Sequence, residues 1–322
     1  MEKRLLSGVK PSGRPHIGNY LGALRQFVDL AATHESFVFV ADYHAMNTVH
    51  DGAQLRELTR DLVLDYLAIG LDPERVTLFK QSDVPEHTEL CWIFNTLTTM
   101  PYLMRAHAFK DAEAKNKDIN VGTFDYPMLM AADILLYEPD IVPVGADQKQ
   151  HIEFARDTAE KFNATYGETF KLPEPYIPEA VATIQGLDGQ KMSKSYNNTI
   201  PLFADDEVLR KACMSIVTDS KGVAEPKDPE ACNVFALHKH ISTNDLAELE
   251  RRYREGGIGY KESKEILAEN LIALVAPLRK RRAELEQDTE LVTRVLTGGA
   301  SRARAVASTK MHEVREKIGV LL

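Results

Sequence analysis

The sequence is poor in cysteine and contains no long apolar run. Only three cysteines, Cys91, Cys213 and Cys232, occur among the 322 residues, and none forms a C-x-x-C pair. We therefore expect no disulfide framework, no structural zinc and no iron–sulfur cluster. The N-terminal stretch MEKRLLSGVK has only two consecutive leucines, too few for a signal peptide or a membrane helix. These absences predict a cytoplasmic protein with no membrane partner.

Net positive charge is also missing. The formal charge of −9 at pH 7 argues against a general nucleic-acid coat protein, and we expect no DNA partner. A local basic face is still compatible with this charge, because basic residues accumulate in the last third of the chain. They are Arg251, Arg252, Arg254, Arg279, Lys280, Arg281, Arg282, Arg302, Arg304 and Arg315. Charges on helices usually pair one turn apart, so these residues favour RNA binding only weakly.

The distribution of apolar residues predicts two parts. The first 190 residues or so alternate short β-branched runs with amphipathic stretches, as is typical of βαβ units around a parallel sheet. Strands are predicted over residues 4–9, 36–41, 76–80 and 140–144, with Pro143 indicating an edge or a strand end. Helices are predicted from about Ile17, from the N-cap Asp51 to Gly70, and from near Asp147.

Strand signals disappear after about Asn198. Several helices are predicted from there to the C-terminus, with turns near Gly222, near residues 256–259, and near Gly298 and Gly299. The predicted fold class is therefore α/β. A Rossmann-like, parallel-sheet nucleotide-binding domain over residues 1–198 is followed by an all-helical domain over residues 199–322.

The segment between the first strand and the first helix, residues 11–19 (PSGRPHIGN), has the composition of a phosphate-binding loop. Backbone N–H groups at a helix N-terminus bind anions, and ligands of parallel sheets collect at the carboxyl ends of the strands. His16 and Asn19 add side-chain donors, and Gly18 allows a base or ribose to approach the backbone closely. Taken alone, the segment could equally be a simple turn, because short glycine motifs are weak signals.

A second segment, residues 191–195 (KMSKS), removes most of this ambiguity. Glycines precede it at Gly186 and Gly189, and Asn197 and Asn198 follow it. Two lysines on a mobile loop can swing onto a polyphosphate and neutralise the charge that develops as pyrophosphate leaves. A solvated patch of charge is the alternative.

These segments resemble the bacterial-type tryptophanyl-tRNA synthetases, within the larger group of synthetases that carry HIGH and KMSKS motifs. The strings SGVKPSGRPHIGNYLGALRQF, MLMAADILLY, IVPVGADQKQHIE and KMSKS follow the family's order and separations over nearly the whole chain, and HIGN occupies the HIGH position. The resemblance implies activation of L-tryptophan with ATP to tryptophanyl-AMP, followed by transfer to tRNA(Trp). It also implies Mg²⁺ bound through the ATP phosphates, no metal site of the protein's own, helical tRNA contacts and a homodimer.

The resemblance further implies the residues of the nucleotide site. The ATP-binding set would be Lys10, Pro11, Ser12, Gly18, Asn19, Gly145, Ala146, Asp147, Ile184, Lys191, Met192, Ser193, Lys194 and Ser195. Charge stabilisation during catalysis would come from His16, Asn19, Lys191 and Lys194, with no protein nucleophile. Asp147 is placed to accept from ribose hydroxyls, although a helix N-cap is its simpler role. Bacterial members commonly have glutamine where this chain has Lys10, so the charge at the phosphate end differs from theirs.

Asp133 is the main candidate for amino-acid specificity. It is the only ionisable residue in MLMAADILL, residues 128–136, a stretch otherwise composed for burial. A buried carboxylate needs a partner, and an indole N–H supplies one donor, whereas an Asp on the outer helix face would need none. The resemblance assigns Asp133 to indole recognition. The other tryptophan-binding residues would be Gln148, Leu6, His44, Met130, Val142 and Val144.

Three other interpretations stay open. A tyrosine hydroxyl could also donate to Asp133, and tyrosyl-type synthetases share the fold and both loops, although PSGRPHIGNYLGA and LMAADILLY resemble the tryptophanyl branch. Small nucleotidyltransferases carry an HxGH-like motif after the first strand, but they generally lack KMSKS and the long helical part. A synthetase-like nucleotide-binding regulatory protein would fit the fold equally well.

Overall fold

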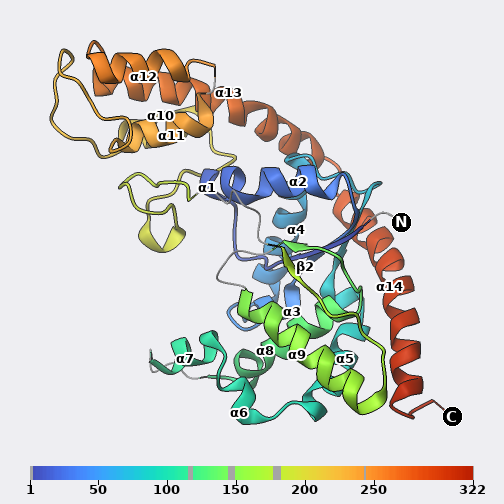
Figure 1. Cartoon of the computed structure of the whole chain (residues 1–322). Helices are drawn as coiled ribbons and strands as arrows, with labels where there is room; N and C mark the ends of the chain where they lie inside the picture. Colours follow the sequence, from blue (N-terminus) through green and yellow to red (C-terminus); the bar gives the residue numbers. More distant parts are fainter. Residues whose placement is uncertain (1–2, 115–118, 144–148, 177–182, 243, 322) are drawn as a thin grey trace.

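The computed structural model of the chain describes residues 3–114, 119–143, 149–176, 183–242 and 244–321 (Figure 1). Its centre is a sheet of three parallel strands, β1 (Arg4–Val9), β2 (Glu35–Val40) and β3 (Val76–Lys80), in the order β1-β2-β3. These strands confirm the prediction to within one residue at each end. Val9 lies beside Val40, and Val40 beside Lys80, so the three carboxyl ends meet at one edge of the sheet.

The predicted fourth strand is shorter than expected. Strand β4 comprises Val142–Pro143 and pairs with β5 (Pro175–Tyr176), while Leu6 donates from its backbone N–H to the carbonyl of Ile141 at 3.0 Å. Strand β4 therefore extends the sheet beyond β1. Val144, which the prediction included in this strand, lies outside the described residues.

Helices cover the sheet (Figure 1). The helix predicted from Ile17 is present as α1 (Ile17–Asn19), a π-helical turn η1 (Tyr20–Leu24) and α2 (Arg25–Ala31). Helix α4 (Gly52–Ala68) starts as predicted, because the Asp51 carboxylate accepts from the N–H groups of Ala53 at 2.7 Å and Gln54 at 3.0 Å. The remaining elements of this part are α3 (Asp42–Ala45), η2 (Gln81–Asp83), α5 (Glu86–Leu97), α6 (Met100–Leu103), α7 (His107–Ala114), α8 (Val121–Leu135), α9 (Lys149–Tyr166) and η4 (Lys194–Tyr196).

The last third of the chain is helical, as predicted. It contains α10 (Asp206–Met214), α11 (Asn233–Ile241), α12 (Leu246–Glu255), α13 (Tyr260–Glu286) and α14 (Leu291–Lys317). Figure 1 shows α10, α11 and α12 gathered at one end of the molecule with the first half of α13, whereas α14 runs alongside the α/β part. None of the helices in the described ranges is long and apolar enough to cross a bilayer.

The turn predicted at Gly298 and Gly299 is wrong, because both residues lie inside α14. Gly299 faces β3, and a Cβ atom at this position would lie 1.8 Å from the carbonyl oxygen of Leu78. Glycine is therefore required by close packing of a helix on a strand, not by a turn. This packing places the apolar face of α14, including Ala303, Ala307 and Met311, in the same hydrophobic core as α5, α8 and α9. The domain boundary after residue 198 stays a prediction, but the core of the first part includes α14.

All three cysteines are buried, and none forms a disulfide. Cys91 lies on α5 in the α/β part, whereas Cys213 lies on α10 and Cys232 immediately precedes α11. Burial raises the pKa of the Cys91 thiol, with a further contribution from the Asp125 carboxylate, and raises the pKa of Cys213 to about 12. The thiols of Cys91 and Cys213 therefore stay protonated in the folded protein at neutral pH.

Candidate functional site

The side chain of His16 caps the first helix and is oriented by Asn19. Its Nδ1 atom accepts from the backbone N–H of Asn19 at 3.2 Å, while the Asn19 Oδ1 atom accepts from the His16 backbone N–H at 3.1 Å. Burial, and then the charge of Lys194, lowers the pKa of His16 to about 4. At neutral pH the ring is therefore uncharged with its proton on Nε2, which makes it a hydrogen-bond donor and not a cation.

The two predicted loops lie against each other. The backbone N–H of Gly18 points at the sulfur of Met192 at 3.2 Å, and the N–H of Ile17 donates to the carbonyl of Ile200 at 2.8 Å. On the other side, the N–H of Leu202 donates to the carbonyl of Pro15 at 3.1 Å. The segment that follows KMSKS is thus hydrogen-bonded along the first loop, so residues far apart in sequence form one wall.

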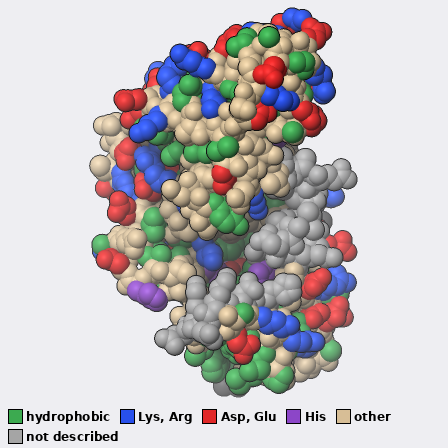
Figure 2. Space-filling view, turned by 90° about the vertical axis from the view of Figure 1, so that its left-hand side faces the viewer, with side chains coloured by type: hydrophobic (Ala, Val, Ile, Leu, Met, Phe, Trp, Pro, Cys, Tyr) green, Lys and Arg blue, Asp and Glu red, His purple; other side chains and the backbone are tan. Residues whose placement is uncertain are grey.

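A cavity of about 340 Å³ opens between these loops. Of the predicted nucleotide-site and catalytic residues, Lys10, Ser12, His16, Asn19, Ser193 and Lys194 line it. The Nζ atom of Lys194 lies 3.2 Å from where a Cβ on Gly13 would be, so the lysine reaches back over the first loop. Burial lowers the pKa of Lys194, and the Asp65 carboxylate across the cavity opposes this effect. Figure 2 shows this side of the molecule hollowed between its two parts, with basic and histidine side chains in the hollow.

Other residues of the predicted set have different positions. Ile184 and Met192 are buried, and the N–H of Met192 donates to the carbonyl of Ile184 at 2.8 Å beneath the loop. Lys191 and Ser195 are exposed, and Pro11 is buried. Within the described residues, neither these five residues nor Gly18 line the cavity. Gly145, Ala146 and Asp147 lie outside the described residues.

The KMSKS loop is held in shape by Asn198, a role that sequence reasoning missed. The Asn198 Oδ1 atom accepts from the backbone N–H of Ser193 at 2.8 Å. Its Nδ2 atom donates to the Asp188 carboxylate at 2.7 Å and to the carbonyl of Lys191 at 3.1 Å. One buried amide therefore fixes both ends of the loop, which leaves Lys194 on the short 3₁₀ turn η4 facing the cavity. The asparagines after KMSKS were the available signal.

Asp133 is buried, with 1% of its surface exposed, and its carboxylate is the centre of a hydrogen-bond network. The Oδ1 atom accepts from Gln81 Nε2 at 2.7 Å and lies 2.6 Å from His87 Nδ1, while Oδ2 lies 2.8 Å from His44 Nε2. Burial alone would raise the pKa of Asp133, but the hydrogen bonds from His44 and His87 outweigh it and lower the pKa to about 2. The carboxylate is therefore ionised at neutral pH.

The network continues from His87 to Tyr137. Nδ1 of His87 faces the Asp133 carboxylate, and its Nε2 atom lies 2.9 Å from the Tyr137 hydroxyl. Burial, together with the charges of Asp133 and Glu86, raises the pKa of Tyr137, so the phenol keeps its proton. Sequence reasoning missed Gln81, His87 and Tyr137. For Gln81 the available signal was the polar sequence QSD at the end of β3, whereas nothing local distinguished His87 or Tyr137.

The remaining predicted tryptophan-site residues surround this network only in part. Leu6 and Val142 are buried, Met130 is partly buried, and all three belong to the apolar cluster that surrounds α8. His44 is already a partner of Asp133. Val144 and Gln148 lie outside the described residues. Among the described residues the Oδ2 atom of Asp133 has one donor, and a carboxylate oxygen can accept about two, which leaves capacity for one ligand N–H.

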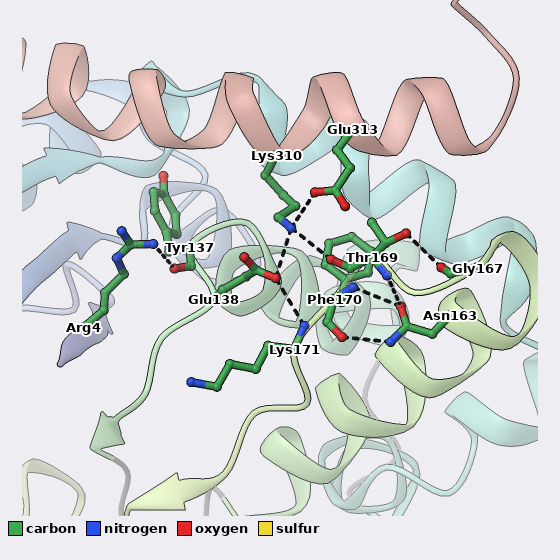
Figure 3. A network of polar contacts seen from close by, with 10 residues as sticks. All are labelled: Arg4, Tyr137, Glu138, Asn163, Gly167, Thr169, Phe170, Lys171, Lys310 and Glu313. Atoms are coloured by element: carbon green, nitrogen blue, oxygen red, sulfur yellow. Dashed lines mark hydrogen bonds and ion pairs between the residues drawn. The ribbon is translucent and has the colours of Figure 1, made fainter. Parts of the chain in front are cut away.

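Helix α14 braces the elements that carry this network (Figure 3). Lys310 donates to the carbonyl of Thr169 at 2.9 Å and forms an ion pair with Glu138 at 3.0 Å, directly after Tyr137. Further along the helix, Arg315 forms two hydrogen bonds with the Glu89 carboxylate on α5, at 2.7 and 2.5 Å. The last helix, which packs against β3, thus supports the segments that carry the Asp133 network.

Most of the basic residues singled out in the last third have intramolecular partners. Arg251 pairs with Glu248 and Glu255, and Arg254 with Glu250. The others with partners include Arg252 (Glu262), Arg279 (Asp206), Lys280 (Glu284), Arg282 (Asp61, Asp65 and Glu286), Arg302 (backbone of β3) and Arg304 (the carbonyl of Asp83). Intramolecular pairing, the simpler of the two interpretations, therefore accounts for most of these side chains, one turn apart for Arg251, Arg254, Lys280 and Arg282 and across longer separations for the others.

Comparison with known proteins decides the family. The family model described as tRNA synthetases class I (W and Y) matches residues 2–276. The chain belongs to this family. This synthetase is 47% identical to the tryptophan–tRNA ligase of Fusobacterium nucleatum over 99% of the chain and 98% of the relative. It is 48% identical to that of Rhodopirellula baltica over 98% of the chain and 99% of the relative.

A solved structure is similar over the same extent. The tryptophanyl-tRNA synthetase of Campylobacter jejuni, solved in complex with ADP and tryptophan, has a TM-score of 0.93 at 45% identity, covering 98% of this chain and 99% of that one. These comparisons confirm the recognised family, the enzyme class and the Rossmann-like fold with its helical C-terminal part. The synthetase is therefore an enzyme of the tryptophan–tRNA ligase type.

Proposed function

We propose that the synthetase activates L-tryptophan with ATP to give tryptophanyl-AMP and pyrophosphate, and then transfers the tryptophanyl group to tRNA(Trp). The observation that carries this proposal is that two unlike sets of polar residues lie at the same edge of the sheet, beyond the carboxyl ends of β1, β2 and β3. An ionised, buried carboxylate at Asp133 suits one N–H donor in an apolar setting, while Lys10 and Lys194 line an open cavity that suits phosphate oxygens.

At the phosphate end, the tryptophan carboxylate would attack the α-phosphorus of ATP in line. The Nε2–H of His16, the Asn19 amide and the ammonium groups of Lys191 and Lys194 would stabilise the charge that moves onto the leaving pyrophosphate. Lys194 already faces the cavity, whereas Lys191 would have to move with the loop. The polar groups that line the cavity are mainly ammonium, amide and hydroxyl groups, which suit phosphate oxygens better than a metal ion. We therefore assign Mg²⁺ to the phosphates, where it neutralises charge.

At the amino-acid end, the indole N–H would donate to the Oδ2 atom of Asp133, whose remaining acceptor capacity supports this assignment. Leu6, Met130 and Val142 would form apolar walls, joined by Val144, and Gln148 would contact the activated amino acid. Phenylalanine has no donor for Oδ2 and would leave a buried charge incompletely solvated, so the site would reject it without proofreading. Tyrosine is the competing substrate, and the tryptophan-specific relatives favour tryptophan.

Two partners complete the proposal. The C-terminal helices would contact tRNA. A homodimer would form through the exposed apolar side chains of α5, α6 and α8, namely Trp92, Met100, Met104 and Val121, of which Trp92 has 71% of its surface exposed. Sedimentation tests the dimer, because Trp92→Glu should convert a dimer to a monomer and a monomeric parent protein would contradict it. The cytoplasmic location stays a prediction from the sequence.

Amino-acid-dependent ATP–pyrophosphate exchange with all twenty amino acids tests the reaction, followed by charging of tRNA. We expect exchange with tryptophan alone and charging of tRNA(Trp). A tyrosine-dependent signal would reassign the substrate. Nucleotide binding without exchange would instead favour the regulatory interpretation.

A further inference from the structure

Asp65 is an ionisable residue on an otherwise apolar, buried stretch of α4. Only 3% of its surface is exposed, and its neighbours in the helix are the buried residues Val63, Leu64, Tyr66 and Leu67. The lining of the cavity proposed for ATP nevertheless includes Asp65, together with Lys10 and Lys194. A carboxylate in a phosphate site is unfavourable by itself, because like charges repel. Its position in this cavity therefore points to a specific use.

A buried arginine fixes this carboxylate in place. Arg282 on α13, with 6% of its surface exposed, donates from Nε to the Oδ1 atom of Asp65 at 2.6 Å. The other two nitrogens of the guanidinium group donate to Asp61 and Glu286. Burial raises the pKa of Asp65, whereas the hydrogen bond and the charge of Arg282 lower it. An arginine stays charged at every physiological pH, so this pairing favours the ionised carboxylate.

Lys194 is the cation of the KMSKS loop on which this carboxylate acts. Both side chains line the same cavity, and Lys194 forms no direct ion pair within the described ranges. Burial lowers the pKa of Lys194, and the charge of Asp65 raises it from across the cavity. The Oδ1 atom of Asp65 is occupied by Arg282, while no described residue donates to Oδ2. Asp65 therefore attracts the ammonium group of Lys194 into the cavity without binding it tightly.

We propose that Asp65 is a positioning residue for adenylate formation, which acts through Lys194. The carboxylate keeps the ammonium group of Lys194 inside the cavity before the reaction begins, so this cation does not have to be drawn in from solvent as pyrophosphate leaves. The same carboxylate repels the phosphates of ATP, and Arg282 limits this repulsion by pairing with Oδ1. The inference rests on the proposed binding of ATP in this cavity.

Asp65→Asn tests this role, because it removes the charge and keeps both the volume and an oxygen for Arg282. The single-turnover rate of adenylate formation should fall by about tenfold, since Lys194 is no longer attracted into the cavity. ATP, titrated by calorimetry without tryptophan, should bind about threefold more tightly, since a like charge has left the cavity. A slower rate together with weaker ATP binding would mean that Asp65 only supports the fold, and would overturn the proposal.

Combining Asp65→Asn with Lys194→Ala shows whether the effect on the rate passes through the lysine. When Lys194 is already absent, loss of the Asp65 charge should not reduce the rate further, whereas ATP should still bind more tightly than it does to Lys194→Ala alone. Fully additive losses of rate would show that Asp65 acts independently of Lys194. Glu57→Gln is the matched control, because it removes an exposed carboxylate of the same helix outside the cavity and should change neither quantity.

A second replacement keeps the test valid if Asp65→Asn folds poorly. Asp65→Leu combined with Arg282→Met removes both charges of the buried pair together, a change that proteins often tolerate. The rate should again fall, while ATP binding should change little because one charge of each sign is lost. If the parent protein forms no adenylate with any amino acid, the proposed function fails, and the role of Asp65 with it. If the parent is active and the rate is unchanged in these variants, only the role of Asp65 fails.

Discussion

The two ends of the candidate site are built on opposite principles. At the phosphate end the donors line an open cavity, and Lys194 lies on an exposed loop whose shape depends on the single amide of Asn198. At the amino-acid end, Asp133 is enclosed, and its carboxylate is oriented by donors from α3, η2 and α5. One end can rearrange around a ligand, and the other cannot without breaking buried hydrogen bonds.

This difference matches what each end has to do. Discrimination between amino acids needs an acceptor whose position is fixed before the ligand arrives, since a movable carboxylate would adapt to the wrong side chain. Neutralising a leaving pyrophosphate needs cations that follow the charge as it moves. Variants at the two ends should therefore separate amino-acid binding from the chemical step.

The largest effect is expected for Asp133→Ala. The change removes the proposed indole acceptor and leaves the buried donors of His44, Gln81 and His87 without their partner, so tryptophan-dependent exchange should fall by about 10³-fold or more. The matched variant Asp133→Asn keeps the volume and should lose less. Calorimetry should show that ATP still binds. A comparable loss of ATP binding would mean that the two ends are not separate.

A smaller loss is expected for Lys194→Ala. The rate of adenylate formation should fall by about 10²-fold, because one cation that faces the leaving group is removed. Tryptophan affinity, measured by equilibrium binding, should be unchanged. Lys191→Ala is the companion variant. A similar loss of rate in this variant would show that the KMSKS loop closes further during the reaction than it does in this structure. Equal losses in rate and tryptophan affinity would contradict a transition-state role for Lys194.

The support of the amino-acid end by α14 can be tested at Gly299. Gly299→Ala places a methyl group against the backbone of β3, which leads directly to Gln81, and should lower the free energy of unfolding by roughly 1 to 3 kcal/mol. The KM for tryptophan should rise by about tenfold or less, with the KM for ATP affected less. Gly298→Ala is the control, since its nearest neighbouring atom would be 3.9 Å away. Equal effects of the two variants would exclude close packing as the cause.

The smallest effect is expected from protonation of His16. Its folded-state pKa is lowered to about 4, so the folded protein binds this proton less readily than the unfolded chain. The stability that depends on neutral His16 is present above about pH 6.5 and is lost as the pH falls toward 4. The kcat/KM for ATP should therefore show no ionisation of His16 between pH 8 and 5. An inflection near pH 6.5 that disappears in His16→Asn would contradict a neutral donor.

Local signals in the sequence predicted the local structure well. The strands β1, β2 and β3, the Asp51 cap and the helical last third follow from apolar periodicity and from capping residues, which act over a few neighbouring positions. The same information predicted a turn at Gly298 and Gly299, because nothing local distinguishes a glycine that ends a helix from one that lets a helix approach a strand. Only the position of β3 makes that distinction.

The candidate site could be predicted only where one segment carries the chemistry. The PSGRPHIGN and KMSKS segments are compact, so the residues of the phosphate end could be named from the sequence. The partners of Asp133, namely His44, Gln81 and His87, lie 46 to 89 positions away from it in the sequence, and each looks like an ordinary polar residue in its own segment. Burial of Asp133 predicted that partners exist, but identifying them needs the tertiary fold. For the basic helices, composition was sufficient to predict that most of the charges pair within the chain, although the partners of Arg279 and Arg282 on distant segments could not be named from the sequence.

The three buried cysteines can serve as native probes of local opening of the folded protein. A thiol reagent reaches a buried thiol only when the surrounding helices separate, so the rate of alkylation measures how often they do so. Cys91 reports on the region beside α8, whereas Cys213 and Cys232 report on the helical end of the molecule. Mass-spectrometric mapping of these three sites would therefore show which end loosens or tightens when a ligand binds, with no engineered label.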